Sequence, residues 1–190
     1  MPLQRSASNR KLGMFLSTFL VAVIAVAVFW AVGAYQRLVR LRSAAVQAFG
    51  GLDAHLLRTL ALLGEYDAAQ ATAGAPDLAA RQTVRATATE CSTWLAAARY
   101  HPLHPDAALK LGAALQALDV AWRVLVQQIP LLATPQGATP WALRWEQQQT
   151  DNAQARQQFG RSVNQYNAAI GQFPAQLLAW LWGFHAARAL

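Results

Sequence analysis

The sequence contains little cysteine and little charge, and each shortage excludes a class of protein. Cys91 is the only cysteine among 190 residues, so the chain cannot form an internal disulfide. Charged residues make up 13% and hydrophobic residues 55%, which is typical of a chain that carries an apolar span rather than of a freely soluble domain. Residues that favour strands are few outside the N-terminal segment, whereas the abundant Ala, Leu, Gln and Arg favour helices. The composition therefore predicts an all-α fold.

Basic residues outnumber acidic residues, 16 to 9, but the excess is not concentrated anywhere. Most arginines occur singly along predicted helices, and the sequence has neither a lysine-rich run nor a platform of aromatic and basic residues. We therefore expect no nucleic-acid partner. A modest attraction to anionic lipid headgroups explains the arginines near the predicted membrane segment more simply.

Groups of catalytic or metal-binding residues are also missing. His101 and His104 lie three residues apart, but neighbouring prolines prevent a shared helical face, and no His-Glu-x-x-His motif occurs. Cys91 falls on the apolar face of a predicted helix, which favours a buried small side chain over a nucleophile. The acidic residues are dispersed, and Gly50-Gly51 lies within a predicted helix rather than in a phosphate-binding loop. We predict a protein without enzyme activity, metal or cofactor.

One long apolar run is present, from Leu12 to Ala34, and it contains no charged residue. Because about 20 apolar helical residues cross the hydrocarbon core of a bilayer, residues 12–34 are predicted to form a transmembrane helix after a short basic tail, residues 1–11. Trp30 and Tyr35 lie near one end of the run, where such rings favour the headgroup layer. The alternative is a cleaved signal peptide, which is disfavoured by the length of the run and by the absence of a clean small-x-small site after it.

The positive-inside rule does not decide the orientation of this span, because three basic residues lie on each side of it. These residues are Arg5, Arg10 and Lys11 before the span, and Arg37, Arg40 and Arg42 after it. The side of the membrane on which the following domain, residues 35–190, lies therefore stays open.

The sequence after the span predicts four long helices. The first continues from the membrane to about Ala73, because apolar residues recur every seven positions in two interleaved tracks. The second helix runs from about Asp77 to Arg99, and the third from about Asp106 to Ile129. The two tracks of the first helix are Leu38, Ala45 and Leu52, and Phe49, Leu56 and Leu63.

The fourth predicted helix has the clearest pattern. Thr139 can cap it, Pro140 fits its first position, and Pro174 stops it. The polar member of its inner track is Asn152, for which two interpretations stay open: an amide that fixes the register of packed helices, or a slightly exposed position near a kink. The track repeats every seven residues and consists of Trp145, Asn152, Phe159, Tyr166 and Phe173.

A short apolar helix from Gln176 to Phe184 is predicted to end the fold. In an up-down bundle the fourth helix returns toward the membrane, so Trp180, Trp182 and Phe184 would lie near the lipid surface. The alternative is that this tail caps the bundle core. The predicted architecture is an N-terminal transmembrane helix that continues into an antiparallel bundle of about four long helices, plus this short C-terminal helix.

Two blocks of residues resemble the LemA family of bacterial membrane proteins. The first begins at Tyr35 and is similar to the family's Tyr-Asn-x-Leu-Val-x-Leu-Arg and Ile-Asp motifs, and the second is similar to its Val-x-x-Tyr-Asn, Phe-Pro and Gly-Phe motifs. The resemblance implies a single-pass anchor in the bacterial inner membrane and an antiparallel bundle, without a settled activity. The matching positions are Leu38, Arg42, Asp53, Tyr166, Asn167, Phe173, Pro174 and Gly183.

The chain also departs from the family pattern. Gln36 replaces Asn, Phe49 replaces Trp, and Gly64 stands where the family has proline in a stretch that follows a basic patch. Because this chain has one arginine in that region, Arg58, a function attached to the patch is not carried over. The resemblance is that of a divergent member.

These features predict a non-enzymatic, membrane-anchored helical scaffold or interaction protein of the bacterial envelope. Its expected partners are the lipid bilayer and unidentified proteins, and a homo-oligomer is left open. The alternative function is a bundle that acts on the bilayer surface in envelope stress or lipid organisation. The candidate membrane-interface residues are Trp30, Tyr35, Arg37, Arg40, Trp180, Trp182 and Phe184.

Overall fold

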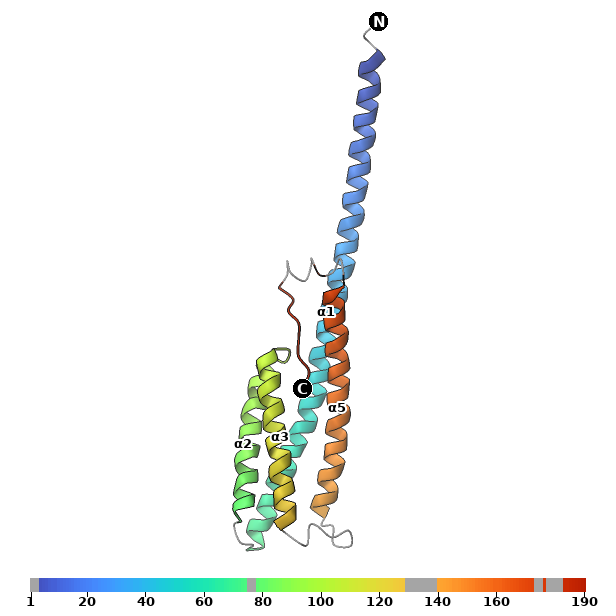
Figure 1. Cartoon of the computed structure of the whole chain (residues 1–190). Helices are drawn as coiled ribbons and strands as arrows, with labels where there is room; N and C mark the ends of the chain where they lie inside the picture. Colours follow the sequence, from blue (N-terminus) through green and yellow to red (C-terminus); the bar gives the residue numbers. More distant parts are fainter. Residues whose placement is uncertain (1–3, 75–77, 129–139, 173–175, 177–182) are drawn as a thin grey trace. The chain divides into compact units, whose positions relative to one another are not determined.

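The computed structural model describes residues 4–74, 78–128, 140–172, 176 and 183–190, with side chains from Thr18 onward except that of Pro140. These residues form four long helices, and none of them is in a strand. The helices are α1 (Gln4–Thr72), α2 (Ala79–Tyr100), α3 (Pro105–Gln128) and α5 (Pro140–Gly171) (Figure 1). The all-α prediction is confirmed for this part of the chain.

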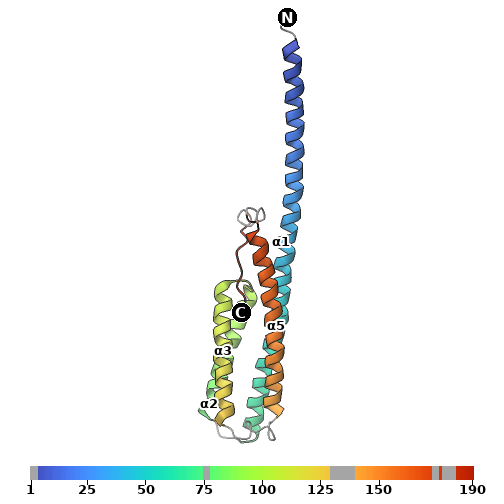
Figure 2. The ribbon, with the colours of Figure 1, turned by 45° about the vertical axis from the view of Figure 1, so that its right-hand side comes forward.

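The chain divides into two compact units. The first comprises Met1–Arg40 with Ala169–His185, and the second comprises Leu41–Ala168 with Ala186–Leu190. The second unit contains the helical bundle, in which α2 and α3 lie side by side next to α5 and the second half of α1 (Figure 2).

In α1 and α5, the seven-residue repeats predict residues that are buried in the structure. Both tracks of α1 are buried from Leu38 to Leu63, and the α5 track is buried from Trp145 to Tyr166. Phe49 and Phe159 join the two helices through an edge-to-face contact with ring centroids 5.7 Å apart. Because an apolar stripe that repeats every seven residues stays on one face of a helix, the repeat identified the inward faces correctly.

An aromatic cluster closes one end of the bundle, where α1 and α3 end and α5 begins. Tyr66 meets Trp122 and Trp141 edge to face, at centroid distances of 5.5 and 5.8 Å. Trp122 also stacks on Trp145 at 4.7 Å. These large rings fill the space between three helices and hold the ends of the bundle together.

The helix ends follow local chemistry. Gly74 has a φ of 63°, a left-handed conformation that favours glycine and is typical of the residue just after a helix end. The two prolines that begin α3 and α5, Pro105 and Pro140, occupy first helical positions, where their missing N–H costs nothing. The predicted starts near Asp106 and at Pro140 are therefore correct to within one residue. The short C-terminal helix predicted for Gln176–Phe184 is wrong at its end, because Gly183 and Phe184 are not helical. Gln176 is helical, and the residues between 176 and 183 lie outside the described residues.

Candidate membrane span and bundle surfaces

The first half of α1 contains the candidate membrane span. An 18-residue window has a mean hydropathy of 2.3, and none of it is buried inside the protein. Its large side chains, including Phe19, Val26 and Phe29, are exposed. Among the described residues this is the one helix whose length and composition suffice to cross a bilayer.

Aromatic residues lie at the C-terminal end of this apolar run, as the sequence predicts. Trp30 and Tyr35 are both exposed at their outer edges. The Tyr35 ring also packs against Phe184 at a centroid distance of 6.1 Å and an angle of 63°. The structure thus brings one predicted residue of the C-terminal tail to the end of the apolar run. Arg37 and Arg40 are exposed two and five residues after Tyr35 on α1, whereas Trp180 and Trp182 lie outside the described residues.

The residues of the first LemA-like block take different roles. Leu38 is buried, whereas Arg42 is exposed and its charge partly offsets the effect of burial, which raises the pKa of Tyr166. Asp53 accepts a hydrogen bond from Nε of Arg99 on α2 at 2.8 Å. The block therefore contributes one core position and two polar positions that lie near other helices.

The second LemA-like block contains a contact that the sequence did not reveal. The side-chain amide of Asn167 donates to the Ala187 carbonyl at 2.7 Å, and the Ala187 N–H donates to Oδ1 of Asn167 at 2.9 Å. This two-bond pair, the Asn167 clasp, fixes the C-terminal segment on α5. Gly183 makes the turn into that segment with a φ of 68°, while Phe173 and Pro174 lie outside the described residues.

The clasped segment continues along the bundle. A Cβ placed on Gly160 would lie 3.8 Å from the Ala189 side chain, and one on Gly112 would lie 3.9 Å from Leu190. The segment therefore lies close to both α5 and α3. Periodicity could not predict this contact, because residues 183–190 form no helix. Its one signal in the sequence is the resemblance of Asn167 to the family's Tyr-Asn motif.

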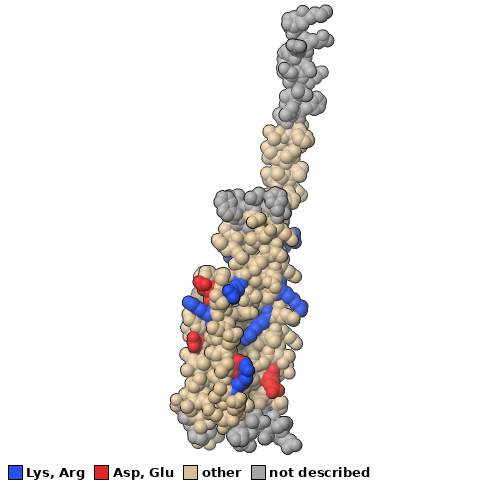
Figure 3. All heavy atoms as spheres, in the orientation of Figure 1, with Lys and Arg blue, Asp and Glu red and all other residues tan. Residues whose placement is uncertain are grey.

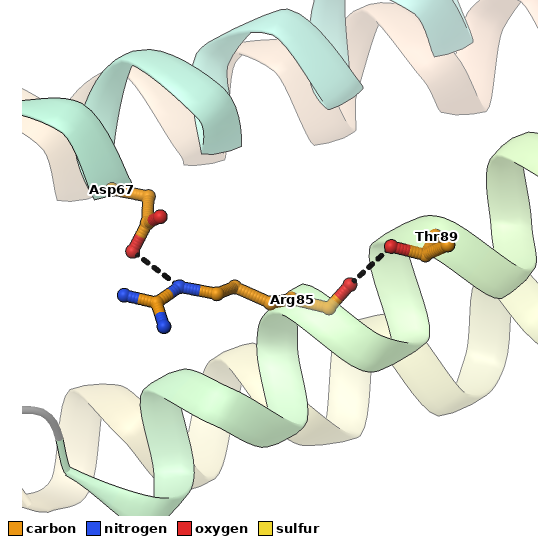
Figure 4. A network of polar contacts seen from close by, with 3 residues as sticks. All are labelled: Asp67, Arg85 and Thr89. Carbon is orange, nitrogen blue, oxygen red and sulfur yellow. Dashed lines mark hydrogen bonds and ion pairs between the residues drawn. The ribbon is translucent and has the colours of Figure 1, made fainter.

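Ion pairs connect α1 to its neighbours. Asp67 accepts from Nε of Arg85 on α2 at 2.8 Å (Figure 4), and Glu65 accepts from Arg144 on α5 at 2.8 Å. On the face shown in Figure 3, basic and acidic side chains are scattered over a largely uncharged surface. Such exposed pairs contribute roughly 0–1 kcal/mol each, so they add little to the stability of the bundle.

Asn152 is buried, with 2% of its surface exposed. Its amide donates to the Thr59 hydroxyl on α1 at 2.9 Å, and that hydroxyl donates to the His55 carbonyl at 3.2 Å. The Asn152 carbonyl oxygen accepts from Gln148 at 3.3 Å. The interpretation of Asn152 as an exposed residue near a kink is therefore wrong. The amide instead joins α5 to α1 inside the core. If the two helices were shifted along each other, these buried polar groups would lose their hydrogen bonds, so the pair favours the observed register.

The residues considered as catalytic or metal-binding candidates do not come together among the described residues. His101 and His104 are exposed in the α2–α3 turn, with ring centroids 6.4 Å apart. Within the described ranges, no group of three His, Cys, Asp or Glu side chains converges. Cys91 is fully buried, and burial raises the pKa of its thiol to about 11. A protonated, enclosed thiol is a poor nucleophile at neutral pH.

Two surface cavities are candidate binding sites. The first, the α2/α3 groove, has a volume of about 530 Å³, and all nine of its described lining residues are uncharged. Small residues such as Thr83, Ala113 and Ala117 line it, with the exposed Val120 and Val124 along one side. The second, the α1/α2 cavity, has a volume of about 380 Å³, and its lining combines apolar residues with the polar and charged side chains of Tyr66, Asp67, Arg81, Arg85, Thr89 and Ser92.

No family model, curated protein or solved structure matches this chain.

Proposed function

We propose that this protein is a non-enzymatic, LemA-like interaction protein, tethered to the bacterial inner membrane by one helix. The supporting observation is the pairing of an exposed apolar run in α1 with a bundle that carries an uncharged, apolar groove on α2 and α3. Tethering confines the bundle to the membrane surface and raises its effective concentration toward partners in the same membrane.

The occupant that fits the groove is a helix of a partner protein that presents an uncharged apolar stripe. Alanine and threonine side chains let a second helix approach closely, and the valines offer apolar area on one side. Because the described lining carries no charge, a charged helix face would lose hydration there without finding an ion-pair partner.

Site-specific photocrosslinking in cells tests this assignment. A benzoylphenylalanine at Val120, on the groove, is compared with one at Leu143 on α5; the two side chains are similarly exposed, at 56% and 58%. We expect one discrete adduct from position 120 that is absent from position 143. The adduct should disappear when Ala117→Glu places a charge in the groove.

Three outcomes distinguish the possible occupants. The proposal is supported by a discrete adduct from position 120 with another protein, if that adduct is lost when the apolar stripe of the partner protein is changed. An adduct with twice the mass of the chain identifies a second copy as the occupant and overturns a partner protein at this site. Equal labelling from positions 120 and 143, or none from either, means that the groove is not a docking surface.

A second function, action on the bilayer surface, is favoured by the contact between Tyr35 and Phe184. This contact places Phe184, which follows Trp180 and Trp182 in the sequence, near the end of the proposed span. The full chain contains seven tryptophans and can be reconstituted with lipids that are brominated near the headgroup and quench the emission of nearby tryptophans. The quenched fraction of the emission distinguishes the two alternatives. If Trp180 and Trp182 lie in the lipid, changing both to Ala lowers the quenched fraction of tryptophan emission. If the tail caps the bundle, the same change raises that fraction.

A further inference from the structure

The last five residues of the chain, 186–190, lie on α5 and α3 in the manner of an extended strand. Exposure alternates along them: Ala186 and Arg188 are exposed, Ala187 is buried, and Ala189 is partly buried. Because successive side chains of an extended chain point to opposite sides, this alternation indicates a segment that lays one side on the bundle. We call residues 186–190 the C-terminal strap.

The Asn167 clasp binds the backbone of the C-terminal strap and not one of its side chains. The side-chain amide donates to the Ala187 carbonyl at 2.7 Å, and Oδ1 accepts from the N–H of the same residue at 2.9 Å. A residue of a neighbouring β-strand makes the same pair of bonds in an antiparallel ladder. Asn167 therefore offers an extended segment what a sheet edge offers in strand addition, namely main-chain bonds that do not depend on the sequence of that segment.

Two glycines widen the surface under the C-terminal strap. A Cβ on Gly160 of α5 would lie 3.8 Å from the Ala189 side chain, and one on Gly112 of α3 would lie 3.9 Å from Leu190. Both distances are ordinary van der Waals contacts, so alanine fits at either position while the strap is in place. Glycine inside a helix is less stable than alanine. The strap therefore requires neither glycine, and each leaves room for a larger occupant.

We propose that the surface under the C-terminal strap is a binding site for an extended peptide segment of another protein, and that the strap competes with this segment in cis. Asn167 binds the backbone of the incoming segment. A small side chain takes the place of Ala187, and a side chain larger than alanine takes the place of Ala189 beside Gly160. The strap holds the site closed because it is part of the same chain and so has a high effective concentration.

The space beside the two glycines favours another protein over a second copy of this chain as the source of the segment. A second copy would bring the same Ala189 and would leave the same space unfilled. The site is also separate from the α2/α3 groove, because none of Asn167, Gly160 and Gly112 lines that groove. Failure of one site therefore leaves the other untouched.

Fluorescence anisotropy of a labelled peptide provides the test, with the full chain in nanodiscs of zwitterionic lipid and empty nanodiscs subtracted. The probe is His-Ala-Ala-Arg-Ala-Leu, the sequence of residues 185–190. Ala187→Pro in the chain releases the strap, because it removes the N–H that donates to Asn167 and leaves Asn167 itself unchanged. We expect this variant to bind the probe saturably, at least about tenfold more tightly than wild type, whose site is occupied. Equal affinities would show that the strap does not close the site, and no saturable binding by Ala187→Pro overturns the proposal.

Two substitutions, each combined with Ala187→Pro, locate the bound probe. Asn167→Ala removes the clasp, and Gly160→Leu fills the surface next to the place of Ala189. We expect each to weaken probe binding at least about tenfold, whereas Gly50→Leu, at an exposed α1 glycine with open space around it, leaves the affinity unchanged. Leucine favours a helix more than glycine does, so Gly160→Leu keeps the test valid if Asn167→Ala impairs folding. Unchanged affinity in the folded variants means that the probe binds elsewhere, which overturns the site.

Two variant probes identify the kind of occupant. The Ala187→Pro probe lacks the N–H that the clasp binds, and we expect it to bind at least about tenfold more weakly than the original probe. The Ala189→Val probe fills the space beside Gly160, and we expect it to bind about three- to tenfold more tightly. Equal binding of the Ala187→Pro probe contradicts backbone recognition by Asn167. If the chain's own sequence binds as tightly as the Ala189→Val probe or more tightly, the site fits the strap of a second copy, and another protein is overturned as the occupant.

Discussion

Because the thiol of Cys91 is buried, the stability of the bundle should fall as the pH becomes alkaline. Burial raises its pKa from 9.0 to about 11, opposed by the charge of Arg156 and assisted by that of Glu90. The unfolded chain therefore loses this proton from about pH 9, whereas the folded chain retains it until about pH 11. The folded state binds more protons in this window, so its free energy of unfolding falls as pH rises, by up to about 2–3 kcal/mol from this group.

Comparison with Cys91→Ala isolates that contribution, because buried Tyr66 and Tyr166 also have raised pKa values and remain in both proteins. Guanidinium unfolding of the full chain in micelles is measured from pH 8 to 11. The difference between wild type and Cys91→Ala should shrink as pH rises. A difference that stays constant across this range would mean that the thiol is not held in its protonated form.

The hydrogen bond from Asn152 to Thr59 predicts an asymmetric response to mutation. In Thr59→Val the buried Asn152 amide loses its acceptor, which costs about 1–3 kcal/mol. In Asn152→Leu the Thr59 hydroxyl still donates to the His55 carbonyl, so the loss should be smaller. The double variant should cost less than the sum of the two, because no amide is left without its partner.

Guanidinium unfolding of the four proteins measures this cycle. Thr83→Val, which removes an exposed hydroxyl that bonds only to its own helix at Ala79, serves as the control and should change stability little. Equal losses in Thr59→Val and Asn152→Leu would mean that the direction of the hydrogen bond does not control the energetics.

At the scale of helices, periodicity predicted most of the bundle. Leu38, Leu52, Phe159 and Val163 are buried as the repeats require, because an inward face needs apolar residues at fixed spacing whatever the partner helix is. Periodicity does not tell which side chain of the next helix lies opposite. Three features depend on which side chains of neighbouring segments lie opposite each other: the burial of Arg81, the ion pairs of α1 and the Asn167 clasp. The spacing of residues in the sequence does not carry that information.

The Asn167 clasp gives the prediction that belongs to this scale. Asn167→Ala removes both bonds to the Ala187 backbone, at 2.7 and 2.9 Å. We expect the Ala187 amide to lose protection in hydrogen exchange and the bundle to lose about 1–3 kcal/mol. Asn164→Ala, at an exposed asparagine one turn earlier on α5, is the matched control. Unchanged protection in Asn167→Ala would show that packing against Gly160 and Gly112 is sufficient to hold the segment.

At the scale of the whole molecule, the exposed apolar run in α1 has to be covered. Its exposed side chains would otherwise present a contiguous apolar surface to water, which is unusual for a soluble monomer. The sequence and the helix agree on where the run lies, and its length and composition suffice to cross a bilayer.

A pair of arginines in the run tests whether it anchors the chain. Val23→Arg with Val26→Arg should cost about 5–7 kcal/mol of insertion free energy, from about 2.5–3.5 kcal/mol for each arginine near the centre of a span. We expect wild type to remain with membranes after alkaline carbonate extraction and the double variant to become soluble. Val120→Arg with Val124→Arg, at exposed valines of the α2/α3 groove, should stay with the membrane. Intact mass of the wild-type protein completes the test: a chain that retains residues 12–34 is anchored by them, whereas a mass that lacks them identifies a cleaved signal peptide, and the bundle would then function without its tether.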